Sequence, residues 1–107
     1  MSKNKIIIGS ALVSVLSLGL ATGSLAGDGA SLYRIKTCWA CHGKDANTPI
    51  MPVYPKLAGQ NADYAFNQMM DIKSGVRSNG QSAAMKGVMH LVSEEEMRII
   101  ADWLSTL

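Results

Sequence analysis

Two cysteines and a histidine stand close together in the segment Cys38-Trp39-Ala40-Cys41-His42. Two thiols three positions apart lie on one face of a helical turn, where they can reach the two vinyl groups along one side of a porphyrin. The histidine follows the second thiol directly, so attaching the ring also brings an imidazole to the iron. The C-x-x-C-H spacing therefore predicts one covalently attached c-type haem, with His42 as an axial ligand.

Cysteine pairs with this spacing also occur in other kinds of site. A thioredoxin-like redox dithiol requires a βαβ context, and a zinc site requires two further ligands. No strand-rich run precedes Cys38, the only other histidine is His90, and the chain has no third cysteine. A redox dithiol or a structural disulfide is therefore the weaker alternative.

The first 26 residues have the pattern of an export signal. Lys3 and Lys5 precede an apolar run over residues 6–21, which is interrupted by glycine and serine and is followed by a segment that ends at Ser24-Leu25-Ala26. The run is shorter than the roughly 20 apolar residues of a spanning helix. We predict a signal peptide over residues 1–26, cleaved after Ala26, with an uncleaved membrane anchor as the alternative. Export and haem attachment both indicate the periplasm.

Residues 27–107 are predicted to form one small domain. A domain of this size buries little apolar surface by itself, and a covalently held haem would stabilise it. Without Lys3 and Lys5, the chain has eight basic and eight acidic side chains. This neutral balance does not favour nucleic acid binding, which requires clustered lysine and arginine.

Apolar periodicity and capping residues predict an all-α domain of three to four short helices around the haem. The first helix would run from Asp28, its N-cap, to Thr37. The second would begin at Asn61 as N-cap, run to about Ser74 and end at Gly75.

The last predicted helix runs to the C-terminus and begins with Ser93-Glu94-Glu95-Glu96, in which Ser93 and Glu96 form a capping box. The second and last helices each carry an apolar stripe suited to helix packing. The stripes consist of Ala62, Ala65, Met69, Ile72 and Val76, with Phe66 and Met70 on the flank, and of Met97, Ile100, Ala101 and Leu104.

Two stretches, residues 43–55 and 75–92, lack a regular period and are predicted as loops because of their proline or glycine content. The second axial ligand would come from the later one, which contains Met85, Met89 and His90. A thioether sulfur is the usual partner of haem iron opposite a histidine. The residue types leave this choice open. We expect His90 to be solvent-exposed, and Met51 in the first loop is a more remote candidate.

Five short motifs along residues 27–107 match a known pattern. They are Cys41-His42-Gly43, Pro55-Lys56-Leu57-Ala58-Gly59-Gln60, Asp63-Tyr64, Asp71-Ile72-Lys73-Ser74-Gly75 and Met85-Lys86-Gly87. With these motifs the chain resembles the class I c-type cytochromes, and more specifically one half of the dihaem cytochrome c-four family. That family joins two such halves, whereas this chain has a single C-x-x-C-H, so transfer between two haems of one chain is not expected.

The resemblance implies roles for individual residues. Cys38 and Cys41 would bind the haem covalently and His42 would be the proximal iron ligand. Met85, which opens a Met-x-Gly motif, would be the distal ligand, with Met89 as the alternative.

The same resemblance implies supporting contacts. The carbonyl of Pro55, in a Pro-x-Leu motif, would accept a hydrogen bond from His42 and thereby fix the imidazole tautomer. Apart from the resemblance, we expect Leu57, Phe66 and Val88 to form an apolar shell that packs on the haem and keeps water off the iron.

Iron with two protein ligands has no open position, so we expect a carrier of single electrons in a respiratory chain, not an enzyme. It would be a monomer with transient redox protein partners and, after signal cleavage, no membrane contact. One alternative is the haem subunit of a larger dehydrogenase complex, such as a sulfide-oxidising flavoprotein; another is an enzyme or gas sensor with a displaced methionine.

Four lysines are candidates for a contact face toward an acidic partner, although solvation is their commoner role. They are Lys44, Lys56, Lys73 and Lys86, of which Lys86, like Arg77, is also a candidate partner of a haem propionate.

Overall fold

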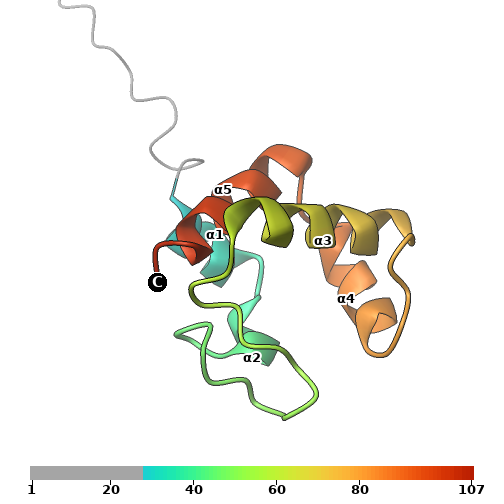
Figure 1. Ribbon diagram of the computed structural model, residues 1–107, viewed down its shortest axis with the longest axis horizontal. Helices are drawn as coiled ribbons and strands as arrows, with labels where there is room; N and C mark the ends of the chain where they lie inside the picture. The colour runs from blue at the N-terminus through green and yellow to red at the C-terminus, as the bar shows by residue number, and fades with distance from the viewer. Residues whose placement is uncertain (1–27) are drawn as a thin grey trace, which may run out of the picture.

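The computed structural model describes residues 28–107, so the predicted signal peptide and its cleavage site lie outside the described residues. This part of the chain contains five helices and no strand. They are α1 (Gly29–Ile35), α2 (Trp39–His42), α3 (Ala62–Ser74), α4 (Ser82–Met89) and α5 (Glu94–Leu104) (Figure 1). The predicted all-α class is confirmed. Among residues 28–107, no helix has the length and apolar character needed to cross a membrane.

The core is built where α5 packs against both α1 and α3. At the crossing of α1 and α5, a Cβ atom added to Gly29 would lie 2.1 Å from the Cβ atom of Trp103, so only glycine allows the two helices to approach this closely. The buried apolar side chains of these helices are Leu32, Tyr33, Ala65, Met69, Ile72, Met97, Ile100, Ala101 and Leu104. The predicted stripes are therefore correct for most residues, but Ala62 is only half-buried, and Val76 is 78% exposed because the chain turns at Gly75.

The helix starts agree with the predicted caps. The Asp28 carboxylate accepts hydrogen bonds from two backbone N–H groups of α1, and the Asn61 side chain accepts one from the third residue after it. Gly75 ends α3 in the left-handed conformation, and Ser93 and Glu96 form the predicted capping box. Local side-chain chemistry is enough to begin these helices.

The expected number of helices was too low, because residues 75–92 were predicted as a loop. Instead, residues 82–89 form α4, and a single turn, α2, carries the C-x-x-C-H segment. The run Ala83-Ala84-Met85-Lys86 consists of strong helix formers, and their preference outweighs the roughly 1 kcal/mol cost of the glycine that follows. In Figure 1, α2 and α4 both lie below α3.

Candidate cofactor-binding site

A largely apolar pocket with a volume of about 480 Å³ is lined by α2, α3, α4 and the segment before α3. Its wall brings together residues that are far apart in the sequence. They include Cys38, Cys41, His42, Val53, Pro55, Leu57, Ala65, Met69, Ile72, Met85, Val88 and Met89. The pocket thus collects both cysteines, the histidine and two methionines, with apolar side chains between them.

The two thiols are free and partly buried on the pocket wall. Burial raises the pKa of the Cys38 thiol to about 11. A redox dithiol requires a lowered thiol pKa, so this environment does not suit thioredoxin-like chemistry. Within residues 28–107, no group of three or more His, Cys, Asp or Glu side chains could hold a metal ion, so the zinc interpretation has no support there either.

His42 is only 7% exposed, and its Nδ1 atom lies 2.8 Å from the carbonyl oxygen of Pro55. A carbonyl can only accept, so Nδ1 carries the proton and the Nε2 lone pair is free to bind a metal. Burial lowers the pKa of His42, while the hydrogen bond to Pro55 acts in the opposite direction. The neutral ring is the form that ligates iron, and the contact implied by the Pro-x-Leu motif is present.

The chain after His42 is held by contacts that the sequence did not indicate. The hydroxyl of Tyr33 donates to the carbonyl oxygen of Gly43 at 2.5 Å. A Cβ atom on Gly43, which has a φ of 88°, would lie 2.2 Å from the carbonyl oxygen of Thr48. The buried Ala46 then accepts a 2.7 Å hydrogen bond from the N–H of Leu57. These contacts bring the Pro-x-Leu segment back to the histidine.

The methionine candidates separate by position. Met85 is half-buried on α4 and lines the pocket, and Met89, one helical turn later, also lines it but is only 2% exposed and belongs to the core. Met51 is 48% exposed, His90 is exposed as expected, and neither is part of the pocket wall.

The formally charged side chains of the pocket wall are basic. Lys56 and Arg77 line it, and the wall contains no Asp or Glu. The Arg77 guanidinium donates to the side-chain oxygen of Gln68 at 2.9 Å, and Gln68 was not anticipated as a pocket residue. Lys86, the other candidate partner of a propionate, is not part of the wall.

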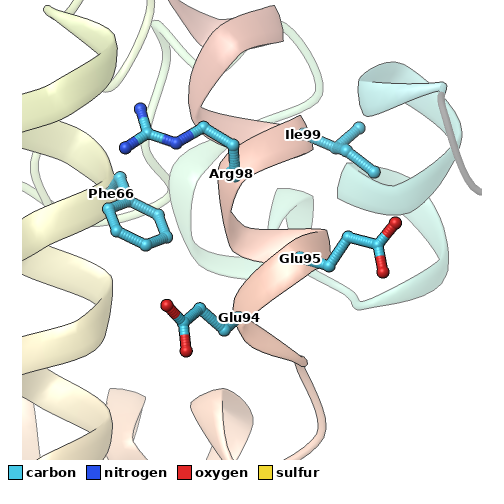
Figure 2. A pocket seen from close by; sticks show the side chains of 5 residues that line it. All are labelled: Phe66, Glu94, Glu95, Arg98 and Ile99. Atoms are coloured by element: carbon cyan, nitrogen blue, oxygen red, sulfur yellow. The ribbon is translucent and has the colours of Figure 1, made fainter.

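Phe66 does not belong to this pocket, contrary to the expectation that it shields the haem. It lines a separate, open hollow between α3 and α5 with Glu94, Glu95, Arg98 and Ile99. Figure 2 shows the Arg98 side chain reaching over Phe66, with its guanidinium carbon 4.1 Å from the ring centroid. Phe66 follows Ala65 on α3, and this one-residue step turns it away from the pocket.

The pocket fits a covalently bound haem. Two thiols and a neutral imidazole lie on one wall, thioether sulfurs lie on α4, the remaining lining is apolar, and the basic side chains suit the carboxylates of a porphyrin. The donor set is therefore the one expected for haem and unlike that of a zinc or redox-dithiol site.

Comparison with known proteins gives a consistent result. A family model described as Cytochrome c matches residues 26–107. Cytochrome c-553 of Nitratidesulfovibrio vulgaris is 32% identical over 103 residues, covering 96% of this chain and 98% of that protein. Cytochrome c4 of Pseudomonas aeruginosa is 38% identical over 104 residues, covering 96% of this chain and 48% of that protein.

A third relative, named Thiosulfate dehydrogenase electron acceptor, comes from Stutzerimonas stutzeri. It is 33% identical over 103 residues, which cover 90% of this chain and 46% of that protein. The chain thus spans nearly all of the first relative and about half the length of the other two.

Proposed function

Because this chain belongs to the cytochrome c family and carries covalently attached haem c, we propose that it is a periplasmic carrier of single electrons with a His/Met-ligated iron. The observation that carries this proposal is the pocket that joins Cys38, Cys41, His42 and Met85. Its activity would be electron transfer alone, without catalysis of a chemical reaction.

In this proposal, Cys38 and Cys41 hold the cofactor through thioether bonds, and His42 and Met85 ligate the iron. The haem supplies a centre whose charge changes by one while both ligands stay in place. His42 can stay in place because its Nδ1–H group is hydrogen-bonded to Pro55. This bond fixes the tautomer and makes Nε2 a better donor.

The apolar side chains of the pocket wall would exclude water from the iron. Leu57 and Val88 are partly buried and pack on the core, and both line the pocket. A low-polarity environment and a thioether ligand both favour the reduced iron. We therefore expect a reduction potential above that of a haem exposed to water.

We propose Met85 rather than Met89 as the sulfur ligand. Met89 is almost fully buried among core side chains, so withdrawing its sulfur would leave a cavity in the core. Met85 is half-buried at the edge of the core and lines the pocket, so its sulfur can reach the iron at a smaller packing cost.

The electron donor that we propose is a dehydrogenase, since one relative is named as the electron acceptor of thiosulfate dehydrogenase. Ile50, Met51 and Val53, in the loop that follows the C-x-x-C-H segment, are exposed and offer an apolar surface beside the pocket. This surface suits brief contact between redox proteins. Lys73 is a poor candidate for such contact because its ammonium group donates to the Val92 carbonyl.

Absorption spectra with a redox titration and carbon monoxide test the proposed function. The holoprotein is expected to show a reversible one-electron change, the far-red band of a methionine–iron bond and slow, weak binding of carbon monoxide when reduced. Rapid and tight carbon monoxide binding would contradict a six-coordinate carrier.

Gel filtration of the native protein distinguishes a monomeric carrier, which elutes alone, from the subunit of a dehydrogenase complex, which elutes with its partner.

A further inference from the structure

The short link between α4 and α5 is held by two lysines from other helices. The ammonium group of Lys36 donates to the carbonyl oxygen of Leu91 at 2.9 Å, and that of Lys73 donates to the carbonyl oxygen of Val92 at 2.5 Å. Both acceptors are backbone groups that follow the last residue of α4. A hydrogen bond from a charged donor is roughly twice as strong as a neutral one.

Both lysines lie at the C-terminal ends of helices that pack in the core. Lys36 is the C-cap residue of α1, and Lys73 lies in the last turn of α3. Lys36 also lies 3.3 Å from the carboxylate of Glu96, which in turn accepts a hydrogen bond from the N–H of Ser93. The link is therefore tied to α1, α3 and the start of α5 together.

Helix α4 has fewer supports of its own than α3 or α5. Its N-cap residue, Gln81, makes no capping hydrogen bond through its side chain, and Gly87 lies in its interior. Its main packing partner is α3. The C-terminal end of α4 is held by Met89, which is buried in the core, and by the link that follows it.

We propose that Lys73, together with Lys36, is a positioning residue that holds α4 so that the sulfur of Met85 stays at the iron. This inference rests on the proposed function, in which Met85 is the axial ligand. The lysines do not touch the haem pocket. They act by restraining Leu91 and Val92, and through them the helix that carries Met85.

Imidazole binding to the ferric holoprotein tests this inference, because imidazole occupies the iron only when the methionine has moved away. Lys73→Met removes the donor and keeps an unbranched apolar stem. It is expected to raise the apparent imidazole affinity on the order of tenfold, the effect of losing one charge-assisted hydrogen bond. Amide hydrogen exchange at Leu91 and Val92 should become faster in the same variant.

Two control variants separate positioning from other effects. Lys44→Met makes the same change of charge at an exposed loop residue and should leave the imidazole affinity unchanged. Leu32→Val weakens the core in α1, away from the pocket, and should lower global stability without raising the imidazole affinity. Lys36→Met tests the second bond if Lys73→Met fails to take up haem.

The inference is wrong if Lys73→Met and Lys36→Met bind imidazole no more tightly than the wild type. It is also wrong if Leu32→Val raises the affinity as much as they do. Failure of the proposed function looks different, because the wild-type protein would then lack the far-red methionine band before any substitution is made.

Discussion

At the scale of single residues, Met85 and Met89 show how one helical turn separates a proposed ligand from a core side chain. Met85→Ala is expected to abolish the far-red methionine–iron band of the oxidised protein and to lower its reduction potential, because the thioether is lost. Met89→Ala should keep the band and lower the free energy of unfolding by about 2–5 kcal/mol, since it empties core volume. Absorption spectra and denaturant unfolding measure both. The opposite pattern would make Met89 the ligand.

The role of a residue can be predicted from the sequence where the residue acts with its immediate neighbours, and less completely where its partners are distant in the chain. The C-x-x-C-H segment and the Pro-x-Leu motif pointed to the pocket wall and to the bond between His42 and Pro55, and this bond is present. Tyr33 and Gln68 were missed because their partners are set by the tertiary fold. Nothing in the local sequence distinguishes such a tyrosine or glutamine from a surface residue.

At the scale of helices, the crossing of α1 and α5 depends on a glycine that has no room for a side chain. Gly29→Ala would place a methyl group against Trp103 and within 2.9 Å of the Ile99 carbonyl oxygen. The helices must then move apart, at an expected cost of about 3 kcal/mol in the free energy of unfolding. Gly87→Ala is the matched control. Its added Cβ meets nothing within 4 Å, so it should stabilise α4 by about 0.5–1 kcal/mol. Equal effects of the two substitutions in denaturant unfolding would argue against this packing.

The capping box of α5 gives the protein a pH-dependent contribution to stability. The hydrogen bond from the Ser93 backbone, aided by Lys36, lowers the pKa of Glu96 below its usual value of 4.5. The folded protein therefore holds this proton less tightly than the unfolded chain. The contribution is complete above the unfolded pKa and is lost as the pH falls through the folded one. Unfolding of the holoprotein at a series of pH values measures it.

Glu96→Gln separates the charge from the cap, because glutamine keeps an acceptor for the N–H group of Ser93. This variant is expected to lose less stability than the wild type as the pH falls below 4.5. Parallel pH profiles for the two proteins would show that the charge of Glu96 contributes nothing.

Helix α4 could not be predicted from the apolar periodicity of its sequence. Its residues were predicted as a loop because the glycines around residues 75–92 were counted as helix breakers. In the structure, Gly75 and Gly80 lie outside α4, and Gly87 lies within the continuous helix. The helix packs on α3 over a short length, and so short an apolar pattern has too few turns to display a clear period. By contrast, α3 and α5 were correctly predicted because they are longer and have side-chain caps.

At the scale of the whole molecule, the pocket implies that the fold depends on its cofactor. Core side chains such as Met69, Ile72 and Ile100 line the pocket as well as packing on one another. Without haem, their pocket-facing surfaces would meet water, and a domain this small has little other apolar burial to compensate. Removing the haem is therefore expected to abolish most of the helical circular dichroism. A haem-free protein that keeps its helices and unfolds cooperatively would contradict this.

The distribution of the proposed iron ligands along the chain also has a kinetic consequence. His42 directly follows the attachment cysteines, whereas Met85 and the exposed His90 lie far along the chain and only a few residues apart. In the unfolded holoprotein, the entropy of closing a loop to the iron is nearly the same for both, because it varies only with the logarithm of loop length. The unfolded chain therefore does not exclude the wrong ligand. Refolding is expected to be slowed by transient ligation through His90, and His90→Gln should remove this slow phase in stopped-flow measurements.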